Sequence, residues 1–449
     1  MRQVYLALVL ATLFVGSVSA QTYDLLIKGG TVNDPSQGLN AARDVGIKNG
    51  LVTAVEANID PGLAGQIYDA TGKTVVPGLI NIHSHFTSTA FPQGTVGVNV
   101  DAIAAARGYT TMVSAGDAGW PKAVSFHNST TGWTTRTYAF LNIAWRGMGD
   151  GWEYTTNPPI LAPTAVCPSG AITRADIEVC ETAGALAANW QFYVGIKVRM
   201  SHFLIGNNVA QVLQMALDAA AKAEAYTGHH FPIMVHVGAL YSTSSIDTIV
   251  SMLRSGDIVT HSYSEWVNQN GIPTGFAQNA SCSNHSAAVA VAKGVVIDLG
   301  GSSAPTYGNN AFGPLSYIMC GKVDVYPPSL SADEFGTASG LYSMVDFASI
   351  LLGLNTGNNI SPTPPAAFLG PIQTAQTLND MIYKMTRGPA LALGDRAPAL
   401  LGTLQIGAPG DVAVLNVQSG SFSYPIAPWT VTSPTKIEVV KTIKGGVIL

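Results

Sequence analysis

Charged residues are scarce in this sequence. Only 11% of its 449 residues are Asp, Glu, Lys or Arg, and the formal net charge is −5. Without an excess of Lys and Arg the chain has no basic stripe of the kind that binds nucleic acid. We therefore expect no nucleic-acid partner.

Long apolar runs are missing after the first twenty residues. A membrane-spanning helix takes roughly 20 apolar residues, and every later apolar stretch is broken by charge, Pro or Gly. The apolar residues 4–15 follow Arg2 and precede Val18-Ser19-Ala20, which is the pattern of a secretory signal peptide. We expect residues 1–20 to be this signal peptide, the mature chain to be secreted, and no membrane partner. A retained N-terminal anchor is the alternative.

Cysteine is rare, and its spacing is not that of a zinc site. The chain has four cysteines, Cys167, Cys180, Cys282 and Cys320, with no Cys-x-x-Cys among them. This favours a structural role, with two disulfides in an oxidising compartment. Three connectivities exist, and closeness in sequence favours 167 with 180 and 282 with 320. Sequons that would make a glycoprotein in a eukaryotic host occur at Asn128, Asn279, Asn284 and Asn359.

The sequence also lacks a Gly-x-Gly-x-x-Gly motif after a strand, which leaves a dinucleotide-binding fold without support. Apolar runs instead alternate with helical stretches such as 210–225 and 286–293. Eight runs are expected to be parallel strands: 75–82, 111–115, 137–143, 192–198, 231–237, 258–261, 295–299 and 329–332. Eight is the number that a (β/α)8 TIM barrel needs. We predict this α/β fold for residues 74–400.

Short strands separated by turns occupy both ends of the mature chain. Within residues 21–73 the pair Asn49-Gly50 is a strong hairpin signal between two alternating runs. Residues 401–449 show the same pattern of short strands. We predict that 21–73 and 401–449 together form one small, discontinuous β-sandwich.

Histidines mark the ends of the predicted barrel strands. Residues i and i+2 of a strand point the same way, so His83 and His85 can both project from the first strand. His236 lies at the end of the fifth strand, His261 ends the sixth, and Asp333 follows the eighth. The ends of barrel strands lie at one rim. Four histidines and a carboxylate there can bind one or two divalent ions, with Zn2+ the leading candidate.

Lys197 lies in the fourth predicted strand, where a lysine is rarely buried without a partner. An ammonium group would repel a metal ion. A Lys197 carbamylated by carbon dioxide would instead be an anion whose two oxygens can bridge two ions; the alternative is a lysine paired with a carboxylate. Each histidine could also be an ordinary core or loop residue. Their repeated position at strand ends favours the metal site.

Ordered motifs cover nearly the whole mature chain: Tyr23-Asp24-Leu25-Leu26-Ile27-Lys28-Gly29-Gly30, Val76-Pro77-Gly78-Leu79-Ile80-Asn81-Ile82-His83-Ser84-His85, Gly195-Ile196-Lys197-Val198-Arg199, Met234-Val235-His236-Val237-Gly238, Gly256-Asp257-Ile258-Val259-Thr260-His261, Leu330-Ser331-Ala332-Asp333 and Gly410-Asp411-Val412-Ala413-Val414-Leu415. This set resembles the amidohydrolase superfamily, and within it the dihydroorotase-like amidohydrolase/deacetylase metallohydrolases. The resemblance implies that His83 and His85 bind the more buried ion and His236 and His261 the more exposed one. It also implies that carbamylated Lys197 bridges the two ions, and that Asp333 is both a ligand and the general acid/base.

The predicted activity follows from this set of residues. A water between two cations loses a proton near neutral pH, and the resulting metal-activated hydroxide is a nucleophile. Asp333 can take up that proton and deliver it to the departing amine or alcohol. We predict a secreted metal-dependent amidohydrolase, deacetylase- or amidase-like, that cleaves an amide or ester bond of a small acylated substrate.

Two alternatives stay open. The same metal barrel could serve another reaction, such as decarboxylation or C–C cleavage. A catalytically inactive binding protein would be expected to have lost a ligand, whereas all six positions are present. A homo-oligomer is also open, because many barrels of this class associate.

The substrate side departs from the family pattern. Related deacetylase-like proteins tend to have Asp-x-Gly-His-Gly on the seventh strand and Leu-His after the aspartate of the eighth. This chain has 298–302 as Asp-Leu-Gly-Gly-Ser and Glu334-Phe335 instead. Both missing histidines are expected near the substrate, while Asp298 is expected to be a structural acceptor. Arg199 is a candidate for binding a substrate carboxylate, with an ion pair to Asp or Glu as the alternative, and His202 and Tyr263 are further substrate-binding candidates.

Overall fold

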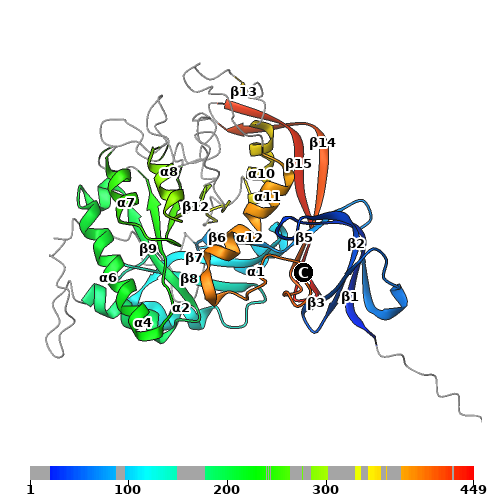
Figure 1. Ribbon diagram of the computed structural model, residues 1–449, viewed down its shortest axis with the longest axis horizontal. Coiled ribbons are helices and arrows are strands. Elements are labelled where there is room, and N and C mark those ends of the chain that lie inside the picture. The colour runs from blue at the N-terminus through cyan, green and yellow to red at the C-terminus, as the bar shows by residue number, and fades with distance from the viewer. Residues whose placement is uncertain are drawn as a thin grey trace, which may run out of the picture.

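The computed structural model describes residues 21–86, 97–148, 177–238, 240, 242, 244–262, 276, 285–301, 329–334, 342–354, 360–361, 376–426 and 429–449. The predicted signal peptide and Tyr263 lie outside these residues. Figure 1 shows a curled parallel sheet with helices around it, and beside it a second sheet that contains strands from both ends of the chain.

The parallel sheet contains seven strands whose order in space follows their order in the chain. They are β6 (Leu79–Ser84), β7 (Tyr109–Gly119), β8 (Arg136–Asn142), β9 (Tyr193–Met200), β10 (Ile233–Val237), β11 (Ile258–Thr260) and β12 (Val296–Ile297). Every residue of β6, β7, β9, β10 and β11 is buried, as expected for parallel strands covered on both faces.

Residues 329–334, the eighth predicted strand, connect the two edges of this sheet. On one side the N–H groups of Leu299 and Gly301 donate to the carbonyls of Ser329 and Ser331. On the other side Glu334 donates to the carbonyl of His83 and accepts from the N–H of His85. The sheet therefore curls until its first and last strands are bridged, which agrees with the predicted α/β barrel class.

Helices flank the strands. They are α1 (Val100–Arg107), α2 (Ala123–Ser129), α4 (Thr182–Ala188), α5 (His202–Ile205), α6 (Val209–Thr227), α7 (Ser245–Met252), α8 (His285–Ala292), α10 (Met344–Leu354), α11 (Leu378–Met385) and α12 (Arg387–Ala392). The longest, α6, buries Val212, Ala216, Ala219 and Ala223 at helical spacing. It ends at Gly228, whose φ of 75° suits a left-handed C-cap. Within the described part of the chain, no helix combines the length and the apolarity needed to cross a membrane.

The two ends of the chain form one mixed sheet of nine strands. Its strands are β1 (Tyr23–Asp34), β2 (Leu39–Lys48), β3 (Leu51–Glu56), β4 (Ala64–Asp69), β5 (Thr74–Pro77), β13 (Ile360–Ser361), β14 (Val412–Ile426), β15 (Trp429–Lys444) and β16 (Val447–Ile448). The N- and C-terminal parts meet where β5 pairs with β14, with Val412 opposite Pro77. The predicted joining of the termini is thus present, but the β-sandwich is not confirmed.

The hairpin predicted at Asn49-Gly50 connects β2 to β3. Asn49 and Gly50 have φ values of 51° and 75°, which a tight two-residue turn requires. By contrast, the prediction that 75–82 is one barrel strand was wrong. Pro77 ends β5 in the terminal sheet and Leu79 begins β6 in the parallel sheet. At the crossing a Cβ on Gly78 would lie 2.1 Å from the hydroxyl oxygen of Thr110, so only glycine fits.

Asp411 joins the terminal sheet to the barrel. Its buried carboxylate accepts from Arg136 at the start of β8 at 2.5 Å and from Lys444 at the end of β15 at 2.8 Å. Burial raises the pKa of Asp411, but the two cations lower it further, so the net shift is downward. The pKa of Lys444 is also lowered, to about 8, because burial outweighs Asp411 and Arg136 repels it. The pKa of Asp411, rather than that of Lys444, therefore determines how the stability of this junction changes in acid, because two cations stabilise the charged form of Asp411.

Replacing Asp411 with Asn is expected to lower the free energy of unfolding by about 3 kcal/mol at pH 7, since two cations lose their buried partner. A depressed carboxyl pKa stabilises above the unfolded value near 3.9 and is lost as pH falls through the folded value. The wild type should therefore lose more stability than Asp411→Asn below about pH 4. Urea unfolding measured across pH checks both statements. Asp24→Asn, which removes an exposed ion pair to Lys48, is the control and should change little.

Candidate metal centre

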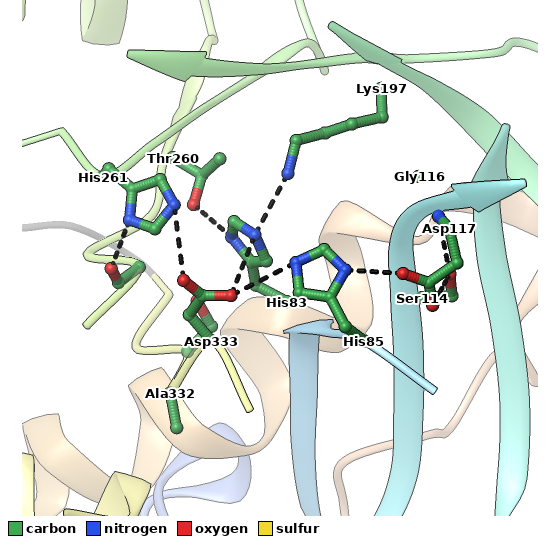
Figure 2. Close-up of polar contacts among 12 residues, drawn as sticks. His83, His85, Ser114, Gly116, Asp117, Lys197, Thr260, His261, Ala332 and Asp333 are labelled. Carbon is green, nitrogen blue, oxygen red and sulfur yellow. Dashed lines mark hydrogen bonds and ion pairs between the residues drawn. The ribbon is translucent and has the colours of Figure 1, made fainter. Parts of the chain in front are cut away.

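Three histidines and one aspartate meet where the strands of the parallel sheet end. His83 and His85 come from the end of β6, His261 follows β11, and Asp333 lies in the segment that bridges the sheet edges. Figure 2 shows their side chains converging, with the carboxylate of Asp333 among the three imidazoles and Lys197 of β9 reaching toward His83. All five side chains are buried.

The contacts of Asp333 define the centre. Its Oδ1 lies 3.4 Å from Nε2 of His83 and 3.4 Å from Nε2 of His85, and its Oδ2 lies 3.7 Å from Nε2 of His261. One ligand atom each from His83, His261 and Asp333 lie within 4.8 Å of one another. The same ring nitrogen of each histidine thus faces a single carboxylate.

The other ring nitrogens are held from outside. Nδ1 of His85 lies 2.6 Å from Oδ1 of Asp117, and Nδ1 of His261 lies 2.6 Å from the carbonyl oxygen of Gly300. A carboxylate and a carbonyl only accept, so each Nδ1 carries a hydrogen, and the Nε2 lone pair of each ring faces inward whenever that ring is neutral. Asp117 is fixed in turn by the N–H of Phe86 and the hydroxyl of Ser114. Such outer partners orient metal-binding histidines.

Burial and neighbouring charges separate the histidines. Burial lowers the pKa of His261 to about 4, and it lowers the pKa of His83 and of His236 well below the ordinary value. Burial would also lower the pKa of His85, but the charge and hydrogen bond of Asp117 raise it to about 9. The neutral rings are therefore ready to bind a cation, whereas a cation bound at Nε2 of His85 would replace a proton.

Two residues of the centre have unusual backbone geometry. His261 has a φ of 56° and Asp333 a φ of 43°, in the left-handed region that non-glycine residues rarely occupy. Backbone strain of this kind clusters at functional sites. Next to them, a Cβ on Gly300 would lie 2.6 Å from the backbone nitrogen of His261. The glycine at this position leaves room for the strained turn that aims His261.

Lys197 lies against a second glycine. Its Nζ is 3.0 Å from Nε2 of His83, and a Cβ on Gly116 would lie 2.7 Å from its Cγ. Asn142, opposite Lys197 in the sheet, donates to the carbonyl of Gly116 and fixes this turn of β7. The end of the Lys197 side chain points toward His83 (Figure 2).

The residues present fit a divalent metal ion. Among the described residues, Nε2 of His261 is a buried atom with no hydrogen-bond partner, and leaving such an atom unsatisfied is costly. Imidazole nitrogens with a carboxylate oxygen are the donor set that zinc and similar borderline ions prefer. The structure thus supports a divalent-metal site formed by His83, His261 and Asp333, with His85 at its side.

Comparisons with known proteins agree with this chemistry. No protein-family model matches the chain. A protein named deacetylase from Enterococcus faecalis is 26% identical over 432 residues, which cover 95% of this chain and 99% of that protein. A protein named dihydroorotase from Trichlorobacter lovleyi is 38% identical over 89 residues, about a fifth of each chain. The crystal structure of an adenine deaminase, 21% identical, has the same fold over 95% of this chain and 99% of its own, with a TM-score of 0.71.

These similarities support the assignment of the chain to an amidohydrolase family. Full-length similarity to a deacetylase, the shared fold and the His-His-Asp group are consistent in this assignment.

The other predicted site residues lie at different distances from the centre. The His236 ring stacks edge-on against His261 with centroids 4.3 Å apart, although His236 is not in the group of close ligand atoms. Arg199 is buried and lies opposite His236 in the pairing of β9 with β10. His202 begins α5, just after β9, and Tyr263 lies outside the described residues. Their roles remain predictions.

Glu334, next to Asp333, has a structural role. It is buried and binds Arg107 in an ion pair at 2.5 Å and the hydroxyl of Tyr109 at 2.8 Å. These contacts anchor the closing segment to α1 and β7. Phe335, which stands where the family pattern has the second histidine, lies outside the described residues.

Sequence reasoning missed the residues that orient the ligands: Asp117, Ser114, Thr260 and the carbonyl of Gly300. Asp117 carried one usable signal, since it follows a buried apolar run as the histidines do.

Proposed function

We propose that this amidohydrolase is a metal-dependent hydrolase that cleaves an amide or ester bond of a small acylated substrate, with deacetylation as its leading activity. The observation that carries the proposal is the convergence of three Nε2 atoms on Asp333. Full-length similarity to a deacetylase supports the substrate class, and the absence of any lost ligand position argues against an inactive binding protein.

His83, His85 and Asp333 would hold the more buried divalent ion, His236 and His261 would hold the more exposed one, and carbamylated Lys197 would bind both. Zn2+ is the proposed ion. When bound, it would polarise the substrate carbonyl and lower the pKa of water. The position of Lys197 supports a carbamate. Its amine is buried beside His83, where an ammonium group would repel a metal ion and a carbamate would attract one.

The residues of the chain handle the proton. Burial raises the pKa of Asp333, but its hydrogen bond to His85 and the charges of the neighbouring histidines lower it overall, so Asp333 is an anion at neutral pH. An anionic carboxylate at this point can accept the proton of the attacking water and then donate it to the departing amine or alcohol. The burial of the centre keeps that proton from exchanging freely with solvent.

Secretion is also proposed, from residues 1–20 and from a disulfide. Cys180 is disulfide-bonded, and its partner lies outside the described residues. Disulfides persist in oxidising compartments. Asn128, a predicted glycosylation site, is exposed at the end of α2.

A substrate panel tests the proposed function. N-acyl amino acids, aryl acetates and β-keto acids are incubated with the full chain, with and without a chelator, and products are identified. Hydrolysis of an N-acyl or acetyl substrate that the chelator abolishes and Zn2+ restores is the expected result. Release of carbon dioxide from the β-keto acids would favour decarboxylation instead, and full activity in protein shown to be free of metal would contradict the proposal.

A further inference from the structure

Asp298 is a buried carboxylate that receives three hydroxyl hydrogen bonds. It follows β12, and its side chain is fully buried. Oδ2 accepts from Thr260 at 2.7 Å and from Ser331 at 2.6 Å, and Oδ1 accepts from Ser329 at 2.7 Å. Its hydroxyl donors come from two elements of the metal centre, the end of β11 and the closing segment.

The hydroxyl hydrogen of Thr260 determines which ring nitrogen of His83 carries a hydrogen. A threonine hydroxyl has one hydrogen to donate, and Thr260 gives it to Asp298. The Thr260 oxygen also lies 2.9 Å from Nδ1 of His83, so in this contact it accepts and Nδ1 donates. The neutral His83 ring therefore carries its hydrogen on Nδ1 and presents the Nε2 lone pair toward Asp333, 3.4 Å away.

The same carboxylate also holds the closing segment. Ser329 and Ser331 come four and two residues before Asp333 and share its extended stretch. The backbone at Asp333 has a φ of 43° and must be held in place by its surroundings. Asp298 is thus linked to His83 through the hydroxyl of Thr260. It is linked to the segment that carries Asp333 through the two serine hydroxyls.

We propose that Asp298 is a positioning residue that fixes the Nδ1–H tautomer of His83 through the hydroxyl of Thr260 and holds the segment carrying Asp333 through Ser329 and Ser331. The inference rests on the proposed metal site. It extends that site to a residue whose carboxylate acts on His83 and Asp333 only through other residues. It gives this buried carboxyl group a role, since an acceptor at its position fixes the direction of the Thr260 hydroxyl.

The test combines two readouts. First, ¹⁵N-histidine NMR of the metal-free full chain reports which ring nitrogen of His83 carries the hydrogen, with the signal assigned by its loss in His83→Gln. Second, competition with a chromophoric chelator gives the affinity for Zn2+. The variants are Thr260→Val, Thr260→Ser and Asp298→Ala, and Thr442→Val is the control because Thr442 is a buried threonine of β15 whose hydroxyl binds a backbone carbonyl in α1.

The wild type is expected to show hydrogen on Nδ1 of His83. Thr260→Val and Asp298→Ala should lose this preference and bind Zn2+ roughly 10- to 100-fold more weakly, while Thr260→Ser and Thr442→Val should stay close to wild type. Hydrogen on Nε2 in the wild type, or unchanged Zn2+ affinity in Thr260→Val, would overturn the inference. The wild-type tautomer needs no variant, so the inference can be decided even if a variant does not fold. Wild-type protein that takes up no divalent metal would instead overturn the proposed function.

Discussion

Replacing Asp333 with Asn is expected to lower kcat/KM on the best panel substrate by about 10²- to 10⁴-fold, the range that a general acid/base contributes. Asp333 places one oxygen 3.4 Å from two imidazole nitrogens and the other 3.7 Å from a third. An amide of the same size keeps the shape but cannot take up a proton, and its NH2 group would face a nitrogen lone pair. Steady-state kinetics, together with the bound metal measured for each protein, checks the prediction.

The matched control is Asp395→Asn. Asp395 also contacts a histidine, His229, at 2.7 Å, but its side chain is 56% exposed and lies outside the centre. This variant should keep wild-type turnover. Full turnover in Asp333→Asn would remove Asp333 from the mechanism, whereas a loss shared equally by Asp395→Asn would point to general instability.

The parts of the centre that could be predicted follow from local geometry. His83 and His85 face one way because side chains of a strand alternate, and His261 and Asp333 could be placed because the ends of parallel strands meet at one edge. Strand positions were predicted because the buried runs are continuous in the sequence. These features need no knowledge of distant contacts.

The outer partners could not be predicted, because they depend on contacts between distant parts of the chain. Thr260 lies 177 residues from His83, and Asp117 lies 32 residues from His85. A threonine in a strand has the same local pattern whether its hydroxyl faces a histidine or a backbone carbonyl.

The break at Pro77-Gly78 shows a limit of hydrophobic pattern. Residues 75–82 are uniformly apolar up to Asn81, and pattern alone reads such a run as one strand. The proline and the glycine marked the change of sheet, since Pro77 cannot donate to a ladder and Gly78 accepts the close approach of Thr110. The terminal sheet and the barrel therefore share one apolar run.

Replacing Lys197 with Met separates two descriptions of the centre by the sign of its effect. If Lys197 is an ammonium group, it stands 3.0 Å from Nε2 of His83 and repels a cation, so its removal should strengthen metal binding. If it is carbamylated, its removal deletes an anionic ligand, and the variant should hold less metal and lose most turnover. We expect the second result, with metal content falling and kcat/KM dropping by at least about 10²-fold, comparable to the loss of a ligand's outer support.

Metal analysis and mass spectrometry of the intact protein under non-acidic conditions make the two descriptions distinguishable. The wild type should carry the added mass of one carbon dioxide, which Lys197→Met lacks. Lys384→Met is the control, because Lys384 is another buried lysine, in α11, outside the centre; it should keep the added mass, the metal and the turnover. A Lys197→Met protein that binds Zn2+ more tightly than the wild type would establish a plain ammonium group and a site for a single ion.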